Sequence, residues 1–330
     1  SLKKAGISAV TLGGVVPNPQ LSKVREGIAL AKKEQVDFIL AVGGGSVIDS
    51  AKGIGYGVVN EGDVWEYYAR RKKVTGCLPI AAAGSEMSNS SVITNEDGWL
   101  KRGLSSDYGR CRFAIMNPEL TMTLPPYQTA SGCTDIILHT MERYFIKENN
   151  MDITDGFAES LMRTVMKHTR ILMKEPNNYE SRAEVMWAGS LSHNDITGSR
   201  SFGDWACHQL EHELSGMYKV AHGAGLAAVW GSWARYVYQE QPSRFAQYAR
   251  NVMGIREEND VECALAGIEA TEQFFKEIGM PTSIHEMGIA LGEEDIQTLA
   301  WKCSFEDKRT IGCFKVLKKE DMENIYRIAK

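Results

Sequence analysis

An aspartate and four histidines lie in two short segments in the second half of the chain. Asp135 and His139 are four residues apart, which places both side chains on one face of a helix. His208 and His212 repeat this spacing on a second expected helix, and His222 opens a third. Imidazoles and a carboxylate bind Fe²⁺, and they also accept Zn²⁺, Ni²⁺ or Co²⁺. The pattern therefore predicts a site for a divalent metal with room for a substrate oxygen.

The two segments offer five candidate ligands for four metal positions. We assign Asp135, His139, His208 and His222 to the metal. His212 is then left near the substrate as a proton carrier, because imidazole titrates close to neutral pH. The other three histidines stand alone in ordinary helical surroundings and are interpreted as structural or surface residues: His168, His193 and His285.

A glycine-rich turn in the first third of the chain predicts a phosphate-binding site. Residues 36–42 form an apolar run interrupted only by Asp37, typical of a parallel strand covered on both faces, and Gly43, Gly44 and Gly45 follow. Ser46 is expected to cap the next helix or to bond a phosphate, and Asp49 to reach a cofactor group. Taken alone, such a turn fits a purely structural connection equally well. A second glycine pattern at 53–57 follows a helix instead of a strand, so it predicts close helix packing.

The arrangement of elements predicts two domains. Residues 1–124 alternate strand and helix, which indicates a doubly wound, Rossmann-like α/β layer. After Pro125 and Pro126 the pattern is helical throughout, so residues 125–330 are expected to form an all-α domain. The chain opens on what looks like the end of a helix, so we expect the first strand of the layer to be missing. The expected strands lie at residues 8–12, 36–42, 74–81 and 112–116, with a hairpin of 90–94 and 100–105.

Composition excludes several classes of protein. The net charge of −5 argues against nucleic acid as a partner, which requires a concentrated basic surface. No apolar stretch approaches the roughly 20 residues of a membrane span, and no signal-peptide pattern opens the chain. The seven cysteines are scattered without a paired motif, which favours reduced thiols in a cytoplasmic protein over a disulfide framework.

Several segments together resemble the iron-containing (group III) alcohol dehydrogenase family, and most closely its NAD(P)H-dependent butanol dehydrogenase branch. They are GGGSVIDSAK, AAGSEMSNSSVIT, NPELTMTLPP, GCTDIILHTMERY and DWACHQLEHELSGMYKVAHGAGLA, in the family's order. The resemblance implies a dehydroquinate-synthase-like α/β domain for the cofactor and a helical domain for the metal. It also implies a homodimer that interconverts an aliphatic alcohol and aldehyde, such as butanol and butanal.

The resemblance maps individual roles onto the chain. The family's metal ligands fall on Asp135, His139, His208 and His222, and its second histidine falls on His212. Its cofactor contacts fall on Asn18, Gly44, Gly45, Ser46, Asp49, Ser85, Ser88 and Lys101. The family segment that helps to choose between NAD and NADP has no counterpart here, so either cofactor is expected.

Three other functions stay open at this point. Dehydroquinate-synthase-like lyases share the glycine turn and a helical metal domain, and glycerol-dehydrogenase-like enzymes carry out related redox chemistry on polyols. The third is a metal-binding protein without turnover. Consumption of NAD(P)H with an aldehyde would separate the first expectation from a lyase and from a protein without turnover, and a substrate panel would separate it from a polyol oxidoreductase.

Overall fold

The computed structural model describes residues 2–82, 86–147, 150–198 and 203–330, and these divide into two units. The units are Ser1–Ile115 and Met116–Lys330, so the division falls upstream of the boundary predicted at Pro125. The intervening chain joins the second unit because the 3₁₀ helix η3 (Pro118–Thr121) packs against helix α6 (Tyr179–Ser192). None of the helices in the described residues is both long and apolar enough to cross a membrane.

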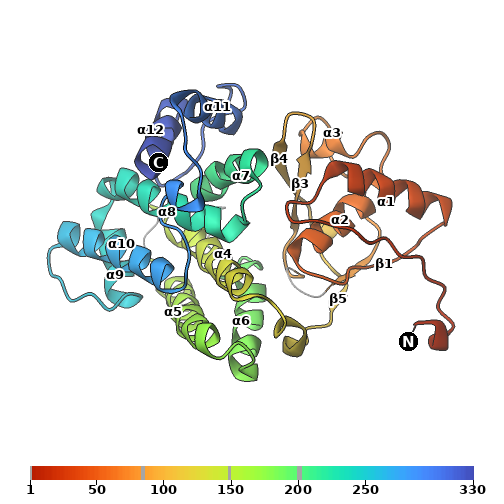
Figure 1. Cartoon of the computed structure of the whole chain (residues 1–330), viewed down its shortest axis with the longest axis horizontal. Helices are drawn as coiled ribbons and strands as arrows, with labels where there is room; N and C mark the ends of the chain where they lie inside the picture. The colour runs from red at the N-terminus through yellow and green to blue at the C-terminus, as the bar shows by residue number, and fades with distance from the viewer. Residues whose placement is uncertain (1, 83–85, 148–149, 199–202) are drawn as a thin grey trace. The chain divides into compact units, whose positions relative to one another are not determined.

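A parallel three-stranded sheet lies in the first unit, with the order β1 (Ile39–Leu40), β2 (Ile80–Ala82), β5 (Phe113–Ala114) (Figure 1). Ile39 pairs with Ile80, and Ala81 pairs with Phe113. Helix α2 (Gly45–Val59) connects β1 to β2 and covers one face of the sheet. This α/β layer agrees with the predicted fold class.

The opposite side of this sheet is exposed, which corrects the expectation that 36–42 is covered on both faces. The exposed side chains alternate with buried or partly buried ones along the chain: Phe38, Leu40, Val42, Phe113 and Ile115. The strands are also shorter than predicted, and the expected strand at residues 8–12 is absent, since these residues pair with no strand in the described chain. An apolar run predicts extended backbone, but neighbouring chain is needed to bury both faces.

Helix α1 (Leu21–Lys33) packs closely on α2, as the second glycine pattern predicts. A Cβ atom at Gly57 would lie 2.2 Å from Cδ1 of Ile28, so only glycine fits there without movement. The short helix α3 (Trp65–Tyr68) follows α2, and the 3₁₀ helices η1 (Leu2–Ala5) and η2 (Asp107–Gly109) complete the unit.

The predicted hairpin is confirmed as β3 (Ser90–Asn95) and β4 (Leu100–Ser105). Helix α2 is tied to the start of this hairpin by a fully buried lysine. The Lys52 amine donates to the backbone oxygens of Ser88 and Ser90, at 2.8 Å each. Asp49 accepts from the backbone N–H of Val92 at 3.0 Å. These bonds fix the hairpin relative to the glycine turn.

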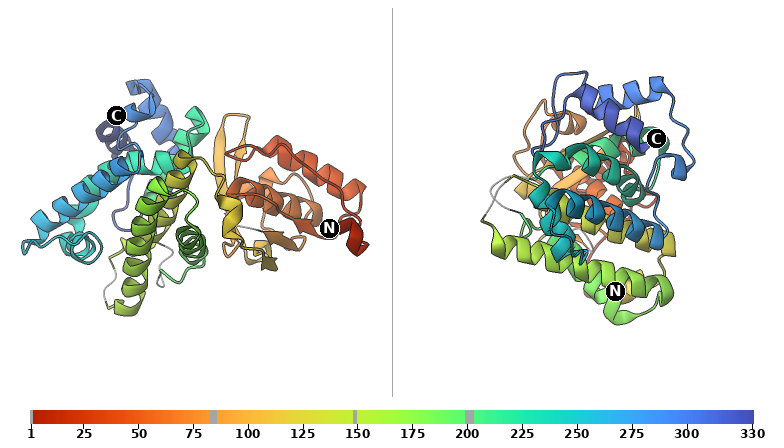
Figure 2. Two further views of the ribbon diagram at one scale, coloured as in Figure 1. Left: turned by 60° about the horizontal axis from the view of Figure 1, so that its bottom comes forward. Right: turned by 90° about the vertical axis from the view of Figure 1, so that its left-hand side faces the viewer.

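The second unit is a helical bundle built around α8 (His222–Val237) (Figure 1). Most residues of α8 are buried. Helices α4 (Pro126–Tyr144), α7 (Ala206–Tyr218), α10 (Asp260–Glu277) and α12 (Lys319–Ala329) contact α8. Helix α5 (Asp152–Lys174) belongs to the same bundle and packs against both α4 and α6 (Figure 2). The remaining elements are α9 (Pro242–Asn251), α11 (Glu293–Cys303), η4 (Tyr238–Glu240) and η5 (His285–Met287). The all-α prediction for this part of the chain is confirmed.

Candidate metal centre

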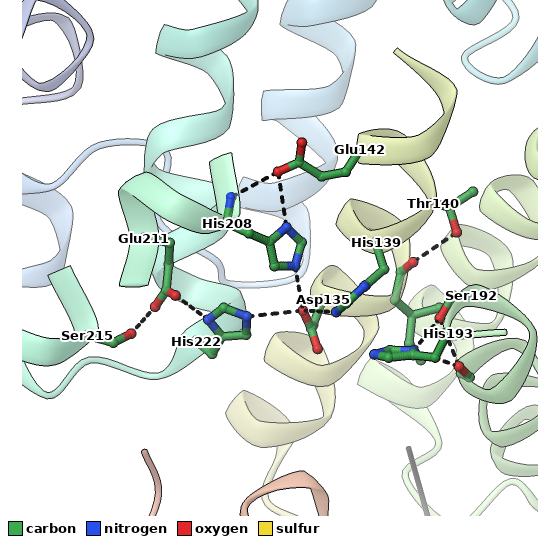
Figure 3. A network of polar contacts seen from close by, with 12 residues as sticks. Asp135, His139, Thr140, Glu142, Ser192, His193, His208, Glu211, Ser215 and His222 are labelled. Atoms are coloured by element: carbon green, nitrogen blue, oxygen red, sulfur yellow. Dashed lines mark hydrogen bonds and ion pairs between the residues drawn. The ribbon is translucent and has the colours of Figure 1, made fainter. Parts of the chain in front are cut away.

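The predicted metal ligands come together around one carboxylate oxygen (Figure 3). Oδ1 of Asp135 lies 3.6 Å from Nε2 of His139 and 3.6 Å from Nε2 of His208. Nε2 of His222 lies 3.5 Å from the same oxygen. The three helices responsible are α4, α7 and α8, and α8 packs against both of the others. Four residues from three helices thus aim their donor atoms at one point.

The distances between the donor atoms are those expected around a shared cation and are too long for hydrogen bonds between them. Two ligands about 2.1 Å from a tetrahedral ion lie roughly 3.4 Å apart, close to the spacing seen here. The buried Asp135 Oδ1 and His208 Nε2 have no hydrogen-bond partner among the described residues. Unpartnered buried polar atoms are costly, and a metal ion that binds them removes that cost.

Two glutamates contact the Nδ1 atoms of His208 and His222, and neither glutamate was predicted from sequence. Glu142 accepts from the backbone N–H of His208 at 2.9 Å and lies 3.1 Å from its Nδ1. Glu211 lies against Nδ1 of His222 and also accepts from the hydroxyl of Ser215. Both glutamates are buried, with at most 2% of the residue exposed. Carboxylates in this position fix the ring orientation of metal-binding histidines and strengthen them as donors.

One sequence signal could have found these glutamates. Each lies three residues after a candidate histidine, Glu142 after His139 and Glu211 after His208. That spacing keeps them near the ligand face of the helix. Which histidine each one contacts depends on packing between helices, since Glu142 on α4 contacts His208 on α7.

The electrostatics suit a cation. Burial raises the pKa of Asp135, but His139, His222 and His208 outweigh it and hold that pKa well below its ordinary value. Burial and the neighbouring His193 hold the pKa of His139 well below its ordinary value. Burial lowers the pKa of His208, but the carboxylates of Asp135 and Glu142 raise it to about 9. Metal binding to an imidazole generally displaces a proton, so a proton and a metal ion would compete for His208.

His212 lies beside the cluster, one turn from His208 on α7. Its ring centre is 5.6 Å from that of His222 and 6.5 Å from that of His208. Glu211, His212 and His222 could form a second ligand group by distance alone. However, Glu211 already contacts Nδ1 of His222, the nitrogen that faces away from Asp135. This arrangement favours His212 outside the ligand set.

The predicted cofactor residues lie in the first unit. Gly44 is the N-cap of α2, which corrects the expectation that Ser46 caps it, and Gly45 and Ser46 form the first turn. These residues present the free N–H groups and positive dipole end that bind phosphate. Asn18 and Lys101, distant in sequence, meet through a 3.0 Å hydrogen bond from the Lys101 amine.

The structure gives less support to the other three predicted cofactor contacts, Asp49, Ser85 and Ser88. Asp49 bonds to the hairpin backbone, and the Ser88 hydroxyl accepts from the backbone N–H of Ser90 at 3.0 Å. Ser85 lies outside the described residues. The structure thus gives Asp49 and Ser88 an internal scaffolding bond in addition to any contact with a cofactor.

The first unit has a parallel layer with a glycine turn, and the second is a helical bundle with a cluster of three histidines and one aspartate. Together these features indicate a metal-dependent enzyme. Two family descriptions match the chain: "Iron-containing alcohol dehydrogenase" over residues 1–118, and "Fe-containing alcohol dehydrogenase family, C-terminal" over residues 129–330. The chain belongs to the iron-containing alcohol dehydrogenase family, as the resemblance indicated, and is an oxidoreductase.

Individual relatives agree over most of the chain. NADH-dependent butanol dehydrogenase A of Clostridium acetobutylicum is 37% identical over 99% of this chain and 85% of its own length. The NADPH-dependent aldehyde reductase YqhD of Escherichia coli is 33% identical over 86% of this chain and 76% of its own length. A crystal structure of NADH-dependent butanol dehydrogenase A from Thermotoga maritima superimposes with a TM-score of 0.95 at 39% identity. It covers 99% of this chain and 85% of the other.

Proposed function

We propose that the protein is a metal-dependent, NAD(P)H-linked alcohol dehydrogenase and aldehyde reductase acting on aliphatic substrates such as butanol and butanal. The observation that carries this proposal is the convergence of three imidazole Nε2 atoms on Asp135 Oδ1. The family and the names of the relatives supply the reaction class. A lyase or a metal-binding protein without turnover fits the family less well.

The chain's own residues have distinct roles in this proposal. Asp135, His139, His208 and His222 would hold the metal, with Fe²⁺ as the first choice and Zn²⁺ as an alternative. When bound, the metal supplies a Lewis acid toward the substrate oxygen and the nicotinamide supplies or accepts the hydride. His212 would carry the substrate proton, as an imidazole near neutrality can.

The cofactor would be held by the first unit. Gly44, Gly45 and Ser46 at the start of α2 would bind its phosphates. Asn18 and Lys101 would bind as a pair, because the Lys101 amine is held by the Asn18 side chain and can meet a phosphate or ribose oxygen. Asp49, Ser85 and Ser88 are further candidate contacts.

We expect NADH to be the better cofactor, because the four butanol dehydrogenases at 34–37% identity are named for NADH. NADPH is the alternative, as in the name of the Escherichia coli reductase. A cytoplasmic homodimer is also part of the proposal, on the resemblance alone. Size-exclusion chromatography with light scattering tests the dimer.

The direct test combines metal analysis with an assay of butanal reduction by NADH and by NADPH. The purified protein should hold about one divalent metal per chain, lose activity on chelation and regain it with Fe²⁺ or Zn²⁺. A panel with 3-hydroxypropanal and betaine aldehyde separates the proposal from diol and choline oxidation, for which two other relatives are named. Full metal occupancy with no aldehyde reduction by either cofactor would refute the enzyme function.

Replacing Glu211 by glutamine should weaken metal binding while leaving all four ligands in place. The amide keeps the shape of the side chain but removes the negative charge that faces Nδ1 of His222. Loss of such a partner typically costs 10-fold to 100-fold in metal affinity. The measurement is the metal dissociation constant by chelator competition, with the exposed Glu180→Gln as the matched control. Unchanged affinity in Glu211→Gln would show that this carboxylate does not support the metal.

A further inference from the structure

The three imidazoles of the cluster are not held in the same way. His208 and His222 each face a buried carboxylate through Nδ1, Glu142 in one case and Glu211 in the other. Nδ1 of His139 is buried and has no hydrogen-bond partner among the described residues. Rotation of the His139 ring is therefore not restrained by a hydrogen bond, although its Nε2 must point at Asp135 Oδ1 to share a metal.

A fourth imidazole packs on the ring of His139, whose Nδ1 has no hydrogen-bond partner among the described residues. The ring centre of His193 lies 3.8 Å from that of His139, with 40° between the ring planes (Figure 3). Trp205 contacts His139 edge-on, at 5.4 Å between ring centres. His193 was predicted from sequence to be an isolated structural or surface residue, but its ring packs against a residue of the cluster.

His193 is itself held firmly. Its Nδ1 donates to the backbone oxygen of Gly189 at 2.8 Å and lies 2.8 Å from the hydroxyl of Ser192. Because a carbonyl oxygen only accepts, the bond to Gly189 places the ring proton on Nδ1. The ring that faces His139 is thus fixed in orientation and in tautomer.

The backbone around His193 is pinned to the turn of α4 that carries His139. The buried Arg143 donates to the backbone oxygen of His139 at 2.9 Å and to that of Ser192 at 2.8 Å. One turn earlier on α6, a Cβ at Gly189 would lie 3.3 Å from Cδ1 of Ile136, so α6 approaches α4 closely. The Arg143 guanidinium therefore links the backbone of His139 to the backbone of Ser192, the residue before His193.

We propose that His193 is a positioning residue for the metal, which orients the His139 ring by direct ring-to-ring packing in place of a hydrogen-bonded carboxylate. The inference rests on the proposed metal site and adds to it a residue outside the ligand set. His193 does not belong to the group whose donor atoms lie within ligand distance, Asp135, His139 and His208. Its effect on the metal is therefore through His139, and it depends on an aromatic ring being present.

The test compares His193→Phe, which keeps a ring, with His193→Ala and His193→Leu, which do not. Each variant is stripped of metal and titrated with Co²⁺, and the dissociation constant and the visible absorption spectrum of bound Co²⁺ are recorded. His168→Ala is the control, because His168 is a partly buried histidine bonded to Ser181 on a different pair of helices. Thermal unfolding of the metal-free proteins identifies any variant that fails to fold.

We expect His193→Ala and His193→Leu to bind Co²⁺ about threefold to tenfold more weakly, the scale on which an aromatic pair contributes. Their Co²⁺ spectra should shift, while His193→Phe and His168→Ala should match the unmodified protein. Wild-type affinity in both His193→Ala and His193→Leu would overturn the inference, as would equal weakening in His193→Phe. If the unmodified protein bound no Co²⁺, the metal site itself, and not the role of His193, would be refuted.

Discussion

His208→Ala should remove the metal and reduce aldehyde reduction by about 10³-fold or more. The His208 imidazole is buried and provides one of the four donors, and its loss also leaves the buried Glu142 carboxylate without its side-chain partner. A bound Lewis acid supplies several kcal/mol of transition-state stabilisation, which corresponds to a factor of this size. The measurements are metal content by elemental analysis and kcat/KM for butanal.

His168→Ala provides the control for this prediction, since His168 lies outside the cluster and should keep both metal and rate. Loss of a partner from a buried charged pair also destabilises the fold, so the unfolding midpoint of His208→Ala should fall. Full metal content in a folded His208→Ala protein would contradict the ligand assignment.

His212→Ala should keep the metal and lose rate. His212 lies one turn beyond His208, with its ring centre 5.6 Å from that of His222, and Asp135 Oδ1 is reached by the other three imidazoles. Loss of a proton carrier typically lowers the rate by 10²-fold to 10⁴-fold. The measurements are metal content and kcat for butanal reduction, together with rescue of kcat by added imidazole.

The two alanine variants separate the roles that the sequence gives to neighbouring histidines. Metal loss in His212→Ala with retention in His208→Ala would exchange their assignments. An unchanged kcat in a metal-loaded His212→Ala protein would show that the proton leaves by another route.

The features predicted correctly from sequence depend on contacts within one element or between adjacent ones. The spacing of Asp135 and His139 fixes their common helix face, because a helix repeats every 3.6 residues. The hairpin was placed nearly to the residue, because a turn with Gly98 in the left-handed region joins two β-rich segments. The start of α2 is an exception and was placed two residues late, because Ser46 is a better capping residue than glycine by type but Gly44 has the required backbone position.

The features that sequence could not predict depend on elements that meet only in the folded chain. Coverage of the sheet is one of them. Residues 36–42 read as doubly buried, yet Leu40 and Val42 are exposed, since burial is a property of neighbouring chain and not of the strand itself. The pairing of Asn18 with Lys101 is another, since it links residues 83 positions apart.

The sequence by itself determined which residues are candidates for the metal, because helical spacing and the chemistry of imidazole and carboxylate are local properties. Only the tertiary structure decided how these residues are held. The assignment of Glu142 to His208, of Glu211 to His222 and of His193 to His139 follows from how α4, α6, α7 and α8 pack. Side chains from different helices meet at distances set by packing of the whole core, which no spacing along one helix specifies.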